Sequence, residues 1–233
     1  HPLIAYTIAA AQQSGVFGEH VYVVARDVPT RELALDTNVR VLNRSDVSEA
    51  DGAPDIVWVR GAFEELARMP SHPDAFAILR PTSPFRTAAT IRRAYDSLFR
   101  RYSRRIDSLR AVELVKQSPY KMWASWALGF SVAGVNVSEF GPVLSGTHQD
   151  GTPYHSSPTQ SLPTIYAQNS SLEMAWTRCV EQYGTISGQK VAPFFTEEYE
   201  GFSIDYPADW REAEYLIASG EAVLPEVSYA VHE

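Results

Sequence analysis

The sequence predicts a three-layer α/β/α domain with a mostly parallel sheet. Two short runs, HVYVVA over 20–25 and AFAIL over 75–79, have the near-continuous hydrophobicity of strands that are buried on both faces. Helical patterns separate these runs, and such alternation favours parallel strands joined by right-handed crossovers. With 233 residues, the chain is long enough for a single domain over 1–233.

The remaining elements are predicted from periodicity and from glycines that end helices. Helices are expected over 2–14, 30–35, 54–68, 88–102 and 209–220. Further strands are expected over 39–42, 107–114, 165–168 and 191–195, and regular structure over 171–176. Cys179, the single cysteine, falls in a helical pattern over 172–183, and we interpret it as an inert packing thiol rather than a nucleophile.

The segment 117–164 breaks this alternation. It is rich in Gly, Ser, Pro and aromatic residues and has weak periodicity, and it is too long for an idle loop in a compact domain. We expect an irregular or β-rich excursion that forms a flap or a dimer contact. His148, Asp150 and His155 lie in it, but their spacing matches no standard metal site.

Composition excludes several classes of protein. The net charge of −8 argues against a general nucleic-acid binder, which usually has a basic surface. No apolar run approaches the roughly 20 residues that span a bilayer, so no membrane association is expected. A lone cysteine cannot form an internal disulfide, which favours a cytoplasmic location.

The first candidate site is the turn Arg80-Pro-Thr-Ser-Pro-Phe-Arg86, between the strand over 75–79 and the next helix. Open α/β sheets bind ligands outside the carboxyl ends of their strands. Arg80 and Arg86 offer forked donors for phosphate or carboxylate, and Thr82 and Ser83 offer hydroxyls. The alternative is a proline-rich connection with solvated arginines.

Two further segments have polar groups near strand ends. Asp205 and Asp209 offer hard oxygen ligands of the kind that Mg²⁺ takes, although Asp209 more simply caps the helix that follows. Tyr166, Gln168 and Asn169 follow a strand, where they either contact a polar substrate or close a turn.

Taken together, these segments resemble the CMP-sialic acid synthetases (acylneuraminate cytidylyltransferases). LRPTSPFRT is similar to the family's Leu-Gln-Pro-Thr-Ser-Pro-Leu-Arg, and FSIDYPADWREAEYLI to its Asp-Ile-Asp-Thr-x-x-Asp ending. HPLIAYTIAAAQQSGVF, VYVVARD and LPTIYAQNSSLEMAW match other family segments in order. The resemblance covers nearly the whole chain.

The resemblance implies a nucleotide-diphosphosugar-transferase-like fold, a homodimer and a nucleotidyl transfer. CTP and a nonulosonic (sialic-type) acid would give the CMP-sugar and pyrophosphate, with Mg²⁺ as cofactor. By position it assigns Asp205 to metal binding and catalysis, and Arg86 to catalysis. It assigns nucleotide or sugar binding to the following residues: Arg80, Thr82, Ser83, Tyr166, Gln168 and Asn169.

Three departures qualify the resemblance. Arg80 replaces the family's Gln, and Ser203 stands at the position of its other metal aspartate. The phosphate loop and first strand of the family precede the segment that matches His1. We therefore expect about 20 to 30 further N-terminal residues in the natural protein, and weak CTP binding with little turnover by the chain as written.

Two alternatives stay open. One is a related nucleotidyltransferase for another keto-deoxy acid, a phosphonate or a sugar phosphate. The other is an inactive relative that serves as a binding or dimerising module.

Overall fold

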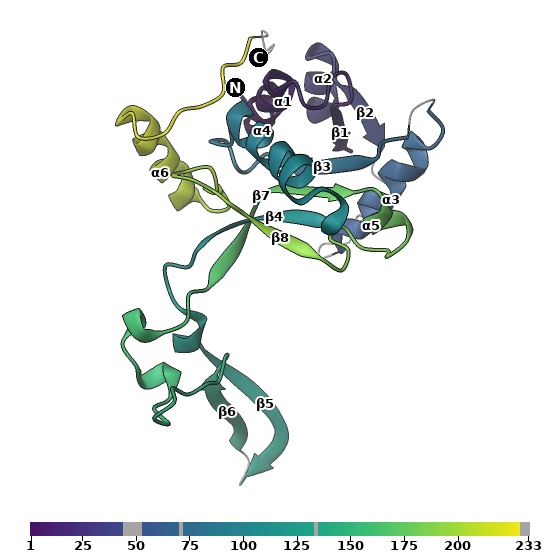
Figure 1. Cartoon of the computed structure of the whole chain (residues 1–233). Helices are drawn as coiled ribbons and strands as arrows, with labels where there is room; N and C mark the ends of the chain where they lie inside the picture. The colour runs from purple at the N-terminus through teal and green to yellow at the C-terminus, as the bar shows by residue number, and fades with distance from the viewer. Residues whose placement is uncertain (44–52, 70–71, 133–134, 229–233) are drawn as a thin grey trace. The chain divides into compact units, whose positions relative to one another are not determined.

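The computed structural model describes residues 1–43, 53–69, 72–132 and 135–228, with the side chains of 125–140 left out. It divides into two compact units, unit 1 over His1–Val112 and Gln168–Glu233 and unit 2 over Glu113–Ala167 (Figure 1). The predicted excursion over 117–164 falls inside unit 2. Among the described residues, no helix is long and apolar enough to cross a lipid bilayer.

Unit 1 contains most of the regular structure. Its helices are α1 (Leu3–Ser14), α2 (Val28–Asp36), α3 (Asp55–Leu66), α4 (Ala88–Asp96), α5 (Arg178–Glu181) and α6 (Pro207–Ala218). Its strands are β1 (Tyr22–Ala25), β2 (Arg40–Asn43), β3 (Ala75–Leu79), β8 (Val191–Phe195) and most of β4 (Ser108–Leu114) and β7 (Tyr166–Trp176). A π-helical turn over Ser97–Tyr102 extends α4.

One prediction about this unit needs correction. The helical pattern over 172–183 is wrong for its first half, because β7 runs to Trp176 and only α5 is helical. The predicted parallel pairing is present in β1–β2 and β4–β8, and β7 adds an antiparallel pair with β3. Leu172, Met174 and Trp176 alternate along β7 and belong to one buried cluster, which gives them the period of a strand.

The strands form two separate sheets that share their helical layers. One sheet has the order β1-β2 and the other β3-β7-β4-β8. Helix α3 packs Val59 and Phe63 against Ile78 of β3, and its Ala62 and Leu66 against Leu42 of β2.

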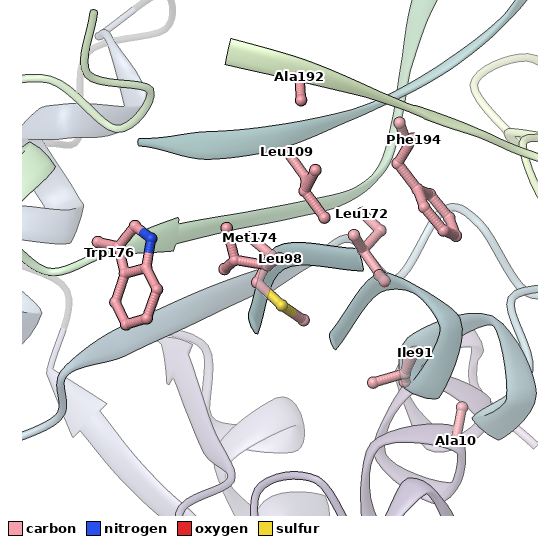
Figure 2. Packing of buried hydrophobic residues seen from close by; sticks show 11 residues of the cluster. Ala10, Ile91, Leu98, Leu109, Leu172, Met174, Trp176, Ala192 and Phe194 are labelled. Atoms are coloured by element: carbon pink, nitrogen blue, oxygen red, sulfur yellow. The ribbon is translucent and has the colours of Figure 1, made fainter. Parts of the chain in front are cut away.

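Helix α1 spans the same two sheets from the other face. Its Ile8 packs with Val23 and Ala25 of β1. Its Ala10 belongs to the cluster on β4, β7 and β8, together with Ile91 of α4 (Figure 2). Helices α1 and α3 therefore each pack against strands of both sheets.

Unit 2 is built differently. Its hairpin pairs β5 (Trp123–Val132) with β6 (Val135–Pro142) in antiparallel fashion. Beside the hairpin, the ring of Tyr154 contacts the rings of Tyr120 and His148, each with centroids 4.8 Å apart. None of the apolar residues of unit 2 whose side chains are described is buried, and Trp123 is 45% exposed.

Candidate active site

The turn over 80–86 leaves the end of β3 and is held at both ends. The backbone N–H of Ser83 donates to the carbonyl of Arg80 (3.3 Å). Phe85 is buried and packs on Phe202, with ring centroids 5.5 Å apart, in a cluster that includes Leu216 of α6. A reciprocal cap by Thr87 then starts α4. The turn is therefore a rigid connection anchored in the apolar interior.

Arg86 lies inside this anchor, with a relative exposure of 1%. Its Nη1 donates to the carbonyls of Arg80 and Ser171, and its Nη2 donates to the hydroxyl of Thr7 (3.0 Å). Burial lowers the pKa of this guanidinium to about 9. Because both terminal nitrogens of the guanidinium donate to protein acceptors, the geometry favours a structural role, and the catalytic role predicted for Arg86 stays a prediction.

Arg80 also turns toward the protein. Its Nη2 pairs with the carboxylates of Asp55 in α3 and Glu173 in β7, the latter at 3.7 Å. Arg110 of β4 pairs with the same Glu173, which is 4% exposed. Burial tends to raise the pKa of Asp55, but hydrogen bonds from Trp58 and Arg80 outweigh it and lower that pKa. Two arginines and two carboxylates thus balance one another, and substrate binding by Arg80 stays a prediction.

Other arginines that suit phosphate also have protein partners. Arg92 donates to the carbonyls of Gln13 and Ser14 at the end of α1. Arg93 forms a two-pronged hydrogen bond with Glu200, at 2.7 and 3.1 Å. These side chains join α1, α4 and the 196–204 loop, so the structure gives them a scaffolding role.

The C-terminal aspartate segment meets the turn directly. The backbone N–H of Ile204 donates to the carbonyl of Thr82 (2.8 Å). This bond brings Ser203 and the exposed Asp205 to the carboxyl end of β3, beside the partly exposed Thr82. Ser83, by contrast, is 1% exposed, and its hydroxyl has no partner in the described structure.

Asp209 has the capping role expected for it. Its carboxylate accepts from the backbone N–H groups of Asp205 (2.9 Å) and Tyr206 (2.7 Å) at the start of α6. The interpretation of Asp209 as a helix cap is confirmed. Asp205 is left as the carboxylate in this segment that has no hydrogen bond or ion pair to its side chain within the described residues.

The donor set suits Mg²⁺ only in part. Among the described residues, no three His, Cys, Asp or Glu side chains gather into a metal cluster. Mg²⁺, however, commonly takes one or two carboxylates and completes its octahedron with waters and substrate phosphates. Asp205 therefore fits the protein side of a magnesium site that a bound phosphate would complete.

The strand segment predicted for sugar binding contains both hydrogen-bonded and exposed side chains. Asn169 donates to Thr196 (2.9 Å), and its oxygen accepts from the backbone and hydroxyl of Ser171. Gln168 is exposed in unit 1, and Tyr166 is exposed in unit 2. Between Asn169 and Ser171, Ser170 has a φ of 58°, a region that favours glycine. The sequence pattern gave no signal for this conformation.

Asp27, at the end of β1, caps α2 by accepting from the N–H of Thr30 (2.9 Å), and this contact lowers its pKa. Cys179 is fully buried, and burial raises the pKa of its thiol to about 11. This burial supports its interpretation as a packing thiol.

A cavity of about 160 Å³ lies near the amino end of β3, opposite the end at which the turn over 80–86 begins. Residues lining it include Asp74, before β3, and Trp176, at the end of β7. It is therefore distinct from the residues predicted to act on a substrate.

Comparison with known proteins shows which sequences and structures this chain is similar to. No protein-family model matches the chain. A CMP-N,N'-diacetyllegionaminic acid synthase from Legionella pneumophila subsp. pneumophila is 27% identical over 225 residues, which are 96% of this chain and 88% of that protein.

Two solved structures have the same fold at 10% sequence identity. A 4-diphosphocytidyl-2C-methyl-D-erythritol synthase from Anaerococcus prevotii gives a TM-score of 0.55, covering 93% of this chain and 89% of the other. A CMP:2-keto-3-deoxy-manno-octonic acid synthetase complexed with CTP gives 0.57, covering 94% and 88%. These similarities confirm the α/β fold and the resemblance to the CMP-sialic acid synthetase family that the sequence indicates.

Proposed function

We propose that this chain is the body of a nucleotidyltransferase that activates a nonulosonic acid with CTP. The relative similar over 96% of the chain is a synthase of a CMP-linked acid of this class. The observation that carries the proposal is the hydrogen bond from Ile204 to Thr82, because it joins the aspartate segment to the turn at the end of β3. Ligands of open α/β sheets bind outside the carboxyl ends of the strands, where this turn lies.

The proposed roles follow from which side chains are free. Asp205 is exposed and holds Mg²⁺ on the protein side, with Ser203 beside it. When bound, the metal neutralises charge on the phosphates. Thr82 and Gln168 offer polar groups to the nucleotide or the sugar. Arg86 and Asn169 act on the substrate indirectly, because Arg86 donates to the carbonyl of Ser171 and Asn169 accepts from the backbone N–H of Ser171.

The reaction balances as a displacement at phosphorus. A hydroxyl oxygen of the acid attacks the α-phosphorus of CTP and forms a P–O bond, and the bond to the β-phosphate oxygen breaks in line. Pyrophosphate leaves, and the hydroxyl proton passes to solvent or a base. Positioning and electrostatic stabilisation supply most of the acceleration in such transfers.

We further propose a homodimer formed through unit 2. Its described apolar side chains are not buried, and Met122, Val143 and Leu144 are each about 40% exposed or more. A second copy would remove these side chains from water, which is the usual reason for such exposure. We place the enzyme in the cytoplasm, where a reduced thiol such as Cys179 is ordinary.

The test is pyrophosphate release by the full-length protein. Each of the four nucleoside triphosphates is paired with nonulosonic acids, other keto-deoxy acids, phosphonates and sugar phosphates, with and without Mg²⁺. We expect release with CTP and a nonulosonic acid only when Mg²⁺ is present. Release with another acceptor would select the related-transferase alternative, and none from any pairing by folded protein would reject the enzyme.

A further inference from the structure

Ser170 has a backbone conformation that serine rarely adopts. Its φ of 58° lies in the left-handed region, where the side chain crowds the following carbonyl and glycine is normally preferred. The residue lies within β7, whose other residues continue as a strand on both sides. Residues held in such conformations cluster at binding sites, where the surrounding contacts maintain the strain.

The contacts that hold Ser170 come from its neighbours. On one side, Asn169 donates to Thr196 and accepts from Ser171. On the other, the carbonyl of Ser171 accepts from the buried Arg86, which also binds the carbonyl of Arg80. The backbone of residue 170 is therefore determined by bonds made by residues 169 and 171.

The side chain of Ser170 is left free by this arrangement. It is partly exposed, and within the described structure its hydroxyl has no hydrogen-bond partner. The register pairs Leu79 with Leu172, so β7 runs past the end of β3 at residues 170 and 171. Ser170 thus lies beyond the carboxyl end of β3, where the turn over 80–86 begins.

We propose that Ser170 binds the substrate, with its hydroxyl donating a hydrogen bond to an anionic oxygen. That oxygen belongs to the carboxylate of the acid or to a phosphate of the nucleotide. The proposal rests on the function proposed above. It explains why a side chain is kept where glycine would avoid the strain, because glycine has no donor to offer.

Three variants of the full-length protein test this assignment. Ser170→Gly removes both the strain and the hydroxyl, whereas Ser170→Ala removes the hydroxyl alone. Asn38→Gly is the control, because Asn38 has a similar φ of 57° in the connection between α2 and β2. We measure kcat and KM for each substrate, with the melting temperature of each variant.

We expect kcat/KM to fall about ten- to one-hundred-fold in both Ser170 variants, the range for a hydrogen bond to a charged group. Ser170→Gly should melt about 2 °C higher than the wild type as the strain is relieved, and Asn38→Gly should keep wild-type kinetics. A KM rise confined to the acid assigns the carboxylate, and one confined to CTP assigns the phosphate.

Wild-type kinetics in Ser170→Ala would overturn the assignment, even if Ser170→Gly fails to fold. If the wild type releases no pyrophosphate, the proposed function fails instead. Calorimetric titration of the wild type and Ser170→Ala with CTP and with the acid then tests Ser170 separately, and equal affinities for both ligands would reject it.

Discussion

The two ends of the strands in the four-stranded sheet use their aspartates in opposite ways. Asp107, just before β4, accepts four hydrogen bonds, from the backbone of Gln189 and Lys190 and from two nitrogens of Arg178. Asp205, near the carboxyl end of β3, is exposed and has no such partner within the described chain. A satisfied buried carboxylate stabilises the fold, whereas a free one is available to a ligand. The comparison predicts separate effects on stability and on activity.

The largest expected effect is on stability, and it comes from substituting Asp107. Asp107→Ala leaves the guanidinium of Arg178 and two backbone N–H groups without their acceptor. We expect the free energy of unfolding to fall by about 3 to 5 kcal/mol, as when a buried ion pair loses one partner. Urea denaturation measures it. The folded fraction should keep its kinetic constants within about two-fold, because Asp107 lies at the opposite end of the strands from the candidate site.

At the carboxyl end of β3, where Asp205 lies, the expected effect is on turnover. Asp205→Asn should lower kcat by about 100-fold, the scale of losing one electrostatic contact in a transition state, and leave the melting temperature unchanged. Asp209→Asn is the matched control four residues away, because Asp209 caps α6. It should reduce stability by about 1 kcal/mol and leave kcat near normal. The reverse pattern would show that the metal-binding aspartate is misplaced.

A substitution of Gly188, which lies against Asp107, should have a smaller effect on stability. Its φ is 71°, and a Cβ there would lie 2.5 Å from the Cβ of Asp107. Gly188→Ala should therefore lower the free energy of unfolding by about 2 kcal/mol. Gly220→Ala is the control, since Gly220 has a φ of 75° with open space around it and tests backbone strain alone. Equal losses in the two variants would remove the close approach to Asp107 from the explanation.

The smallest effect is the response to acid. Burial tends to raise the pKa of Asp107, but bonds from Lys190, Gln189 and Arg178 outweigh it and lower the pKa. The stabilisation is therefore complete above the unfolded pKa of about 3.9 and is lost as pH falls through the lower folded value. Asp107→Asn should flatten the fall in stability below about pH 4, measured by denaturant titration at several pH values. An unchanged slope would contradict the lowered pKa.

The sequence predicted the positions of the strands better than the partners of individual side chains. The run over 75–79 became β3 with the same bounds, because an apolar run between polar segments suits one buried environment. The segment 172–176 was misread because Leu, Glu and Met are good helix formers. Pairing with neighbours far apart in the chain, such as Leu79 with Leu172, overrode that propensity.

The candidate site shows the same division. The family resemblance assigned the turn and Asp205 to one site, and the hydrogen bond between Thr82 and Ile204 joins their two segments. Nothing local to Arg80 indicated that its guanidinium would meet Asp55 and Glu173, which lie 25 and 93 positions away. Ser170 was missed for a similar reason, since its conformation depends on bonds made by its neighbours.

Arg86 has a consequence for the order of events during synthesis. Its guanidinium joins Thr7, 79 residues earlier, to the carbonyl of Ser171, 85 residues later. A ribosome must therefore add all of unit 2 before the last of these partners exists. Until then the turn contains a charged arginine without its full set of acceptors, which disfavours its burial. The candidate site is thus completed late, after the N-terminal helices are already available to pack.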